Sequence, residues 1–284
     1  ENVTVYYSCI TNRLLKGGIL TMFTSHFSMI AQPFCEKTPT SLIMKDERFT
    51  QGLARLQYLL LSGSIAVVYG QTGVGKSTLL NLFFSQIPLN LFLPVYVHFT
   101  RVKTSSLFAL IVSQLREIPK HTKDRLFLQI IDKARRSNLT PILIIDEAHL
   151  LSADVLTDLR LLVSSTHDSS TQLKIVLSGQ EHLKTILKRD VLADLAQRVS
   201  VHYHVRPLTK VQTAAYIDFH LKTSGASEKI FDSNVKDLIH EFSAGVPRQI
   251  NAISTACLMT ASCKQSQIVT QDIFNQALDE FQSF

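Results

Sequence analysis

The chain has 284 residues, of which 45% are hydrophobic and 18% charged, which is enough apolar material for a folded core and excludes an intrinsically disordered chain. Its 29 Lys and Arg against 23 Asp and Glu give a net charge of +6, a mild bias toward polyanionic partners that an ordinary basic surface explains equally well. The four cysteines lack zinc-finger spacing and no apolar run is long enough for a transmembrane helix, so we expect a cytoplasmic protein without a membrane anchor.

The first 21 residues show no pattern that predicts a structure or a role. Met22 is a plausible second start, so we treat residues 1–21 as an unassigned N-terminal appendage. From Asp46 to Ser62, apolar residues recur at helical spacing and predict an amphipathic helix. A buried strand over 64–69 follows, and a second helix is expected after Lys76.

The alternation of strand and helix continues along the chain. Residues 94–100 are rich in β-branched and aromatic side chains and predict a strand, followed by helices at about 105–118 and 122–137. Residues 141–150, "PILIIDEAHL", predict a continuous apolar strand that carries two carboxylates, with the pattern typical of a strand buried on both faces.

A helix at about 153–165 and a strand at 173–179 complete this series, which predicts an α/β fold with a parallel sheet and helices on both faces. After the strand-like stretch at 199–209 the pattern becomes purely helical. We therefore place a domain boundary near Pro207, between a core of residues 22–207 and a small helical lid of residues 208–284. The expected lid helices cover 210–224, 232–244, 247–263 and 270–282.

The loop "GQTGVGKST" lies between a predicted strand and a predicted helix and matches the Walker A pattern. Its glycines allow backbone N–H groups to face phosphates, its lysine reaches the β- and γ-phosphates, and its serine hydroxyl is a Mg²⁺ ligand. A glycine-rich turn with an exposed lysine is the simpler alternative. The predicted phosphate-binding residues are Gly70, Gln71, Thr72, Gly73, Val74, Gly75, Lys76, Ser77 and Thr78.

Two carboxylates follow the apolar strand "ILII". Asp146 is expected at the carboxyl edge of the sheet, where a Walker B acid binds Mg²⁺ together with Ser77. Glu147 is the candidate general base that polarises the attacking water. Taken alone, each acid is more simply explained as a solvated strand end. Together, however, the two motifs predict the same ligand, MgATP, and its hydrolysis.

The motifs of this chain resemble those of the ExeA/GspA-like AAA+ ATPases from Met22 to the end. This resemblance implies an AAA+ P-loop NTPase core with a C-terminal helical lid, and ring or filament assembly. Besides the Walker A loop it is carried by "HFSMIAQPF" (26–34), "LIIDEAHLL" (143–151), "LRLLVSS" (159–165), "VLSGQEHL" (176–183), "LAQRVSVHYHVRPLT" (195–209) and "SAGVPRQIN" (243–251).

The resemblance also implies three further site residues. Gln180 is the candidate for sensor 1, with Ser178 as the alternative, and Arg248 is the candidate for sensor 2, the lid arginine that contacts the γ-phosphate. An arginine from the neighbouring subunit usually completes such a site. Arg198 is the first candidate for it and Arg189 the second, although a surface arginine explains either one.

Two branches of the resemblance predict different functions. ExeA/GspA proteins of secretion continue into a transmembrane helix and a periplasmic part, which are not found before Phe284, so we expect the other branch. That branch resembles in role the TnsC, TniB, IstB and MuB ATPases, which bind double-stranded DNA as ATP-dependent oligomers and recruit a transposase. A secretion or envelope ATPase and a nucleotide-switched signalling module remain alternatives.

Basic loop residues are the expected contacts to DNA phosphates, although a solvated charged face is the simpler interpretation. The alternation in "HYH" (202–204) predicts two outward histidines around an inward tyrosine rather than a metal site. The candidate DNA contacts are Arg101, Lys103, Lys120, His121, Lys123 and Arg125.

Overall fold

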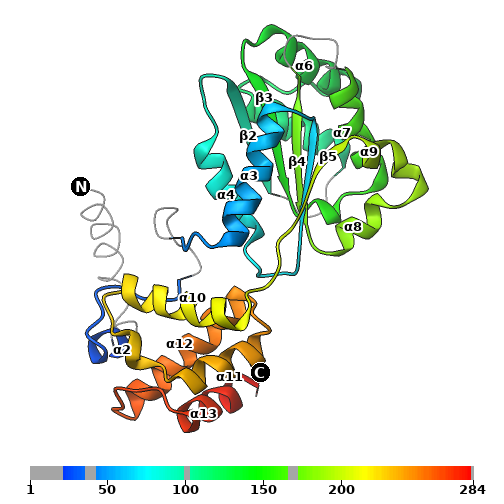
Figure 1. Ribbon diagram of the computed structural model, residues 1–284. Helices are drawn as coiled ribbons and strands as arrows, with labels where there is room; N and C mark the ends of the chain where they lie inside the picture. Colours follow the sequence, from blue (N-terminus) through cyan, green and yellow to red (C-terminus); the bar gives the residue numbers. More distant parts are fainter. Residues whose placement is uncertain (1–21, 36–42, 99–102, 166–171, 283–284) are drawn as a thin grey trace. The chain divides into compact units, whose positions relative to one another are not determined.

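The computed structural model describes residues 22–35, 43–98, 103–165 and 172–282. Contacts within the chain divide it into two compact units. The sheet unit comprises residues 45–206. The helical unit comprises residues 207–284 together with the described residues before Lys45. Figure 1 shows the elements of both units in sequence colours.

The sheet unit contains a five-stranded sheet in the order β2-β3-β4-β1-β5, in which every neighbouring pair is parallel. Because all strands run the same way, their carboxyl ends meet at one edge, where ligands of open α/β sheets bind. Ile145 pairs with Leu177, and Val68 pairs with Ser178, which fixes the ends of the three central strands relative to one another. The strands are β1 Ile65–Tyr69, β2 Phe92–His98, β3 Thr140–Asp146, β4 Lys174–Gly179 and β5 Val199–His204.

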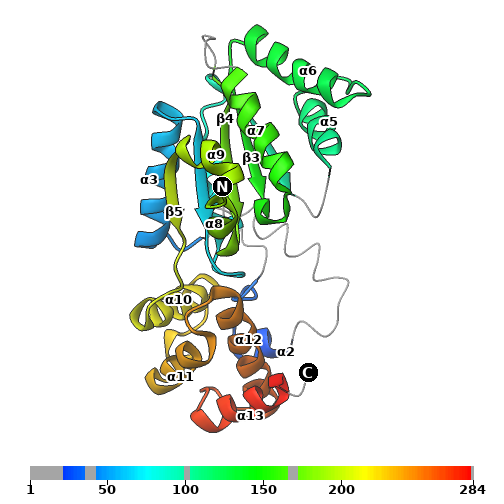
Figure 2. The same ribbon diagram turned by 90° about the vertical axis from the view of Figure 1, so that its right-hand side faces the viewer.

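Helices cover both faces of this sheet (Figure 2). On one face, α3 Glu47–Leu61 and α4 Lys76–Gln86 pack together and against the central strands. On the other face, fully buried side chains such as Phe108 and Leu159 pack against alternate strand residues, including Val67 and Ile145. The helices of this second face are α5 Thr104–Gln114, α6 Lys123–Arg136, α7 Ala153–Ser165, α8 His182–Leu187 and α9 Ala193–Gln197.

The α/β fold predicted from the sequence is confirmed, but some element bounds differ. β2 already begins at Phe92, where it pairs with Thr140. β3 ends at Asp146 rather than at residue 150, because Glu147 takes a left-handed conformation with φ 55° and starts a short 3-10 turn, η2 Ala148–Leu150. The short helices α8 and α9 were not predicted, since they are too brief to give a helical period.

The helical unit is built around its own apolar core, which includes Ile217, Ile253 and Leu258. Thr209 caps α10 through a reciprocal capping box with Gln212, and Pro247 opens α12 at a position where its missing N–H costs nothing. The helices of this unit are α2 Met22–His26, α10 Lys210–Thr223, α11 Ser233–Ser243, α12 Pro247–Cys263 and α13 Gln271–Gln282.

The lead-in before Lys45 differs from the sequence-based division, which assigned residues from Met22 onward to the core domain. Its phenylalanines Phe23, Phe27 and Phe34 are buried in the core of the helical unit. The carbonyl of Pro33 lies 3.1 Å from Nδ1 of the buried His220. The sequence shows three aromatic side chains in this short segment, but it does not show which helices they pack against.

None of the helices in the described ranges combines the length and the hydropathy that crossing a lipid bilayer requires.

Candidate nucleotide-binding site

The glycine-rich loop connects β1 to α4 at the carboxyl edge of the sheet. Gly73 and Gly75 have φ values of 81° and 105°, which glycine adopts without the steric cost that a Cβ would bring. A Cβ on Gly70 would lie 2.4 Å from the carbonyl oxygen of Val205, the residue that follows β5. The first residue of the loop therefore packs against the chain leaving β5 and leaves no room for a side chain. The local sequence therefore forms a tight loop that leads directly into a helix N-terminus, a favourable site for an anion.

Lys76 is buried in the first turn of α4, with 5% of its surface exposed. Its Nζ donates to the carbonyl oxygens of Gly70 at 2.9 Å and Gln71 at 2.8 Å. The ammonium group is thus held inside the loop whose backbone would surround a phosphate.

Asp146 is fully buried at the end of β3 and lies opposite the first turn of α4. Its Oδ2 accepts hydrogen bonds from Ser77 Oγ at 2.7 Å and from the hydroxyl of Tyr96 at 3.0 Å. Burial, followed by the charge and hydrogen bond of Asp146, raises the pKa of Tyr96 above its ordinary value, so this phenol remains a donor. His98 Nδ1 lies 3.7 Å from the same carboxylate oxygen. Tyr96 was not predicted from the sequence, because its contact with Asp146 depends on β2 and β3 being neighbours.

Glu147 follows Asp146 and has a half-buried side chain, with 27% of it exposed. Its backbone N–H donates to Asp146 Oδ1 at 3.0 Å. This hydrogen bond stabilises the turn in which the chain changes direction after β3. The Glu147 carboxylate lies 3.3 Å from Nδ1 of His149, a residue that the sequence analysis did not select. The sequence offered one signal for His149, namely that it stands two residues after the acidic pair and completes the stretch "DEAH".

Ser178 and Gln180, the two candidates for sensor 1, both lie at the end of β4, between the strands that carry the other two motifs. Ser178 is fully buried, and its Oγ has no hydrogen-bond partner among the described residues. Leu177 on β4 pairs with Ile145 on β3, so Ser178 and Asp146, the residues that follow them, occupy equivalent positions on neighbouring strands. The backbone N–H of Gln180 donates to Nδ1 of His149 at 3.4 Å. The structure thus brings Gln180 into contact with the turn after β3 through its backbone.

The three arginine candidates belong to elements other than those that carry the glycine-rich loop and the acidic pair. Arg198 is exposed and directly precedes β5, so it is at the amino edge of the sheet, whereas the glycine-rich loop is at the carboxyl edge. A six-residue strand such as β5 spans about 20 Å, which places Arg198 far from the loop of its own chain. Arg189 is exposed at the start of the 3-10 turn Asp190–Leu192. Arg248 is exposed in the first turn of α12, in the helical unit.

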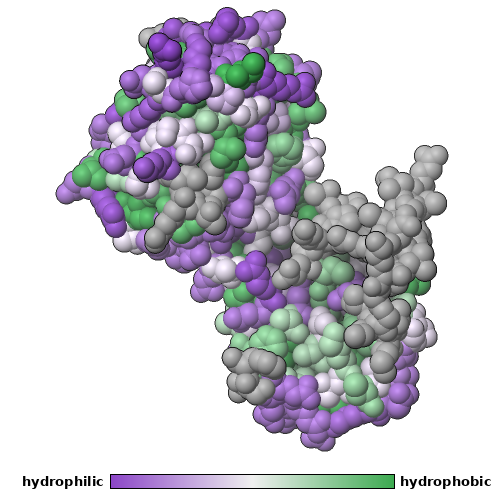
Figure 3. All heavy atoms as spheres, turned by 180° about the vertical axis from the view of Figure 1, so that it is seen from behind, coloured by the Kyte–Doolittle hydropathy of each residue, from purple (hydrophilic) through white to green (hydrophobic). Residues whose placement is uncertain are grey.

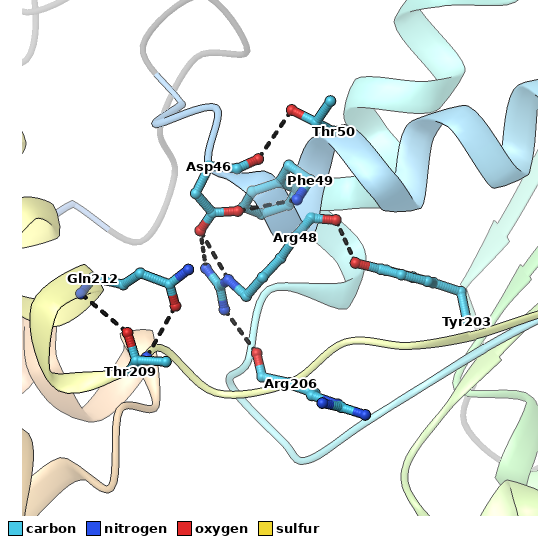
Figure 4. A network of polar contacts seen from close by, with 8 residues as sticks. All are labelled: Asp46, Arg48, Phe49, Thr50, Tyr203, Arg206, Thr209 and Gln212. Atoms are coloured by element: carbon cyan, nitrogen blue, oxygen red, sulfur yellow. Dashed lines mark hydrogen bonds and ion pairs between the residues drawn. The ribbon is translucent and has the colours of Figure 1, made fainter.

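A network of polar contacts lies at the N-terminus of α3 (Figure 4). Asp46 caps the helix by accepting from the Phe49 N–H at 3.0 Å, and its other oxygen accepts from Arg48 Nε at 2.8 Å. Arg48 Nη1 donates to the carbonyl of Arg206 at 2.8 Å, and Tyr203 donates to the carbonyl of Arg48. Both ends of the sheet unit's chain, at Asp46 and at Arg206, are therefore tied together by one guanidinium group.

The same network touches the glycine-rich loop. A Cβ on Gly75 would lie 3.3 Å from Cζ of Phe49, so the ring packs directly against the last glycine of the loop. Together with the contact of Gly70 and Val205, this places both chain ends of the sheet unit against the loop. Sequence reasoning missed Arg48 and Phe49, because they precede the motif by more than twenty residues.

The "HYH" stretch behaves as the alternation predicts. Tyr203 is buried and His202 exposed. His204 lies 2.6 Å from Glu181 and stacks on Tyr69 with ring centroids 4.9 Å apart. A cluster of three or more His, Cys, Asp or Glu side chains suited to a metal is not found within the described ranges.

The donor set of the site fits a magnesium nucleotide. Mg²⁺ prefers oxygen ligands, and the Ser77 hydroxyl and Asp146 carboxylate already converge within hydrogen-bond distance. The backbone of the loop and Lys76 would hold the phosphates, which together with water would supply the remaining Mg²⁺ ligands.

The parallel sheet, the glycine-rich loop after β1 and the acids after β3 define an AAA+ P-loop fold. Residues 61–187 match the AAA domain family. The structure is similar to that of Orc1 of Aeropyrum pernix, solved in complex with DNA, with a TM-score of 0.65 and 16% identity over 86% of this chain and 68% of that one. It is also similar to Cdc6p from Pyrobaculum aerophilum, with a TM-score of 0.68 and 16% identity over 90% of this chain and 70% of that one. At this identity the likeness is one of fold.

A relative in sequence is General secretion pathway protein A of Aeromonas hydrophila. It is 31% identical over 261 residues, which are 89% of this chain and 47% of the relative. The chain thus has homology to an ExeA/GspA-type protein and spans about half of its length.

Proposed function

We propose that the chain is an Mg²⁺-dependent ATPase that binds double-stranded DNA as an ATP-dependent oligomer and recruits or activates a transposase. The observation that carries the ATPase part is the convergence of Lys76, Ser77, Asp146 and Glu147 at the carboxyl edge of one sheet. In this proposal Lys76 binds the β- and γ-phosphates, Ser77 and Asp146 hold Mg²⁺, and Glu147 activates water.

The remaining site residues complete the proposed reaction. Gln180 or Ser178 would orient the water near the γ-phosphate. Arg248 would contact the γ-phosphate from the helical unit, and a guanidinium group suits this role because it is always charged and offers several donors. Arg198 would act on the site of a neighbouring subunit, since it lies at the opposite edge of the sheet from its own loop. Shared sites of this kind require self-association into a ring or filament.

The DNA part of the proposal is supported by a concentration of positive charge on the hairpin formed by α5 and α6. Residues 116–136 contain seven Lys and Arg against three Asp and Glu, while the whole chain has a net charge of +6. Lys120, His121 and Arg125 are exposed there. Figure 3 shows a largely hydrophilic surface over this end of the sheet unit. Lys123 is less available, because it pairs with Asp158 at 2.7 Å.

Two other candidate contacts follow the second strand in the sequence. Lys103 is exposed at the start of α5, and Arg101 lies outside the described residues. Phosphate contacts through such side chains give salt-sensitive binding with little sequence preference. Orc1 of Aeropyrum pernix, which shares the fold, was solved with DNA. A cytoplasmic location follows from the proposal, because ATP and chromosomal DNA are available there.

DNA binding is tested by fluorescence anisotropy with a labelled duplex in ATP, ADP and a non-hydrolysable ATP analogue. We expect tighter binding with ATP and the analogue than with ADP. The double variant Lys120→Glu and Arg125→Glu should weaken binding and make it less dependent on salt, whereas Lys264→Glu, an exposed lysine of the helical unit, is the matched control. Negligible affinity that does not change with nucleotide would exclude the DNA part.

A second candidate function is the ATPase part of a secretion or envelope-assembly protein. The observation that favours it is the 31% identity to General secretion pathway protein A. The two candidates share the ATP site and differ in their partner. Nucleotide-dependent DNA binding together with stimulation by a transposase would favour the first, and ATP turnover without any DNA response would favour the second.

A further inference from the structure

The turn after Glu147 is packed tightly against the end of β4. His149 lies in this turn, and only 6% of its side chain is exposed. A Cβ on Gly179 would lie 3.1 Å from the backbone nitrogen of His149 and 3.0 Å from Leu183 Cδ2, so the turn approaches β4 as closely as a glycine permits. The imidazole therefore has a fixed place between the acidic pair and the loop after β4.

One nitrogen of this imidazole faces two partners. His149 Nδ1 lies 3.3 Å from Glu147 Oε2, and it accepts a hydrogen bond of 3.4 Å from the backbone N–H of Gln180. Burial lowers the pKa of His149, with smaller lowering effects from His182 and Lys76, against the raising effects of Glu147 and Asp146. A neutral imidazole carries one proton. Nδ1 can accept from Gln180 or donate to Glu147, but it cannot do both at once.

We propose that His149 is a positioning residue whose Nδ1 exchanges between the Gln180 N–H and the Glu147 carboxylate, so that the loop after β4 controls the orientation of Glu147. The inference rests on the proposed ATP hydrolysis, in which Glu147 is the base. His149 is the only ion-pair partner of Glu147 in the part of the chain that the structure describes. A base is effective when a further group holds it in its working orientation, and His149 is placed to be that group.

Side-chain chemistry at position 149 allows a sharp test. An asparagine amide occupies the place of Nδ1 and can donate or accept, whereas a glutamine amide lies near the place of Nε2, and leucine fills the volume without polar atoms. His149→Gln and His149→Leu should lower kcat at least about tenfold while the Kd for ATP stays within about twofold, because a positioning effect acts on the chemical step. His149→Asn should retain most of the turnover.

The matched control is His182→Asn. His182 is exposed, and its ring lies 6.0 Å from that of His149, but no ion pair joins it to the acidic pair among the residues that the structure describes. Turnover of this control should equal that of the wild type. Equal impairment in His149→Asn and His149→Leu would overturn the inference, as would wild-type turnover in His149→Gln. The comparison of the Asn and Gln variants remains decisive if the leucine variant does not fold.

A second readout does not depend on hydrolysis. The long-range ¹H–¹⁵N spectrum of the histidine rings, with His149 assigned from its absence in His149→Asn, reports which nitrogen carries the proton. In the nucleotide-free wild type we expect an unprotonated Nδ1, because it accepts from Gln180. A protonated Nδ1 in that state would overturn the inference. A wild-type protein that does not hydrolyse ATP would instead refute the proposed function, whatever the spectrum shows.

Discussion

The hydroxyl of Ser77 donates a hydrogen bond of 2.7 Å to Oδ2 of Asp146, which lies 69 residues further along the chain. This contact joins the first turn of α4 to the end of β3 and brings together the two side chains that would hold Mg²⁺. Ser77 and Asp146 therefore belong to one site, and variants of either one should affect the same property, the dependence of the reaction on Mg²⁺.

The first prediction concerns this property. Asp146→Asn keeps the shape of the side chain but removes its charge, so half-saturation of ATP turnover should require at least about tenfold more Mg²⁺. The measurement is turnover against Mg²⁺ concentration. Ser85→Ala is a suitable control, because the Ser85 hydroxyl donates to the carbonyl of Leu82 on the same helix. An unchanged Mg²⁺ requirement in Asp146→Asn would remove Asp146 from the site.

The second prediction concerns the base. Glu147→Gln should retain ATP binding and nearly abolish turnover, because an amide cannot accept the proton of the attacking water. In the proposed function this variant also accumulates as assemblies on DNA, since hydrolysis no longer releases them. Binding of a fluorescent ATP analogue and phosphate release are the two measurements. If the variant lost its affinity for ATP, Glu147 would have a binding role instead.

The third prediction concerns Arg48, which joins Asp46 to the carbonyl of Arg206 (Figure 4). The side chains of Arg48 and Asp46 are only 11% and 5% exposed, so Arg48→Met leaves a buried carboxylate without its cation. We expect a loss of about 3 kcal/mol in the free energy of unfolding. Urea denaturation followed by circular dichroism measures it.

Arg55→Met is the matched control for this change. Arg55 also lies on α3 and also donates to a carbonyl of β5, that of His202 at 3.0 Å, but it is exposed. Its loss should cost less than about 1 kcal/mol. Similar losses in the free energy of unfolding for the two variants would show that the buried ion pair of Arg48 does not stabilise the protein more than the exposed contact of Arg55.

The fourth prediction concerns pH and the helical unit. Burial lowers the pKa of His220 to about 4, although a hydrogen bond with the carbonyl of Pro33 opposes this shift. The rings of Phe34, Tyr216 and Phe219 surround it. Folding therefore favours the neutral form, and its contribution to stability is complete above about pH 6.5 and is lost as the pH falls through about 4.

This loss should amount to on the order of 3 kcal/mol. His220→Phe should remove most of this pH dependence, whereas His202→Asn, at an exposed position, should leave it unchanged. Hydrogen exchange of α10 in urea at pH 7 and pH 4.5 measures the effect within the helical unit. A wild-type protein whose α10 is equally protected at both pH values would contradict the assignment.

The fifth prediction concerns the arginine that acts between subunits. Arg198→Ala and Lys76→Ala should each lack turnover, and mixing them should restore part of it, because some interfaces then combine an intact Lys76 with an intact Arg198 from the neighbour. The measurement is ATP turnover at a series of mixing ratios. Recovery in mixtures with Arg189→Ala, but not with Arg198→Ala, would assign the role to Arg189.

The sequence alone was sufficient for the local parts of this protein. The alternation of apolar strands and amphipathic helices predicted the α/β fold, because burial on two faces of a sheet imposes that pattern on each segment. The glycine-rich loop and the acids Asp146 and Glu147 are contiguous motifs whose geometry depends mainly on neighbouring residues. These features could be recognised without knowing which strands are adjacent.

Only the tertiary structure decided which distant residues meet. Tyr96 reaches Asp146 because β2 lies beside β3, and His149 reaches Gln180 because β3 lies beside β4. Phe23, Phe27 and Phe34 join the helical unit, and Arg48 joins Arg206, through contacts between segments far apart in the chain. Strand order and helix packing arise from the burial of the whole apolar surface at once, so no single segment of the sequence contains them.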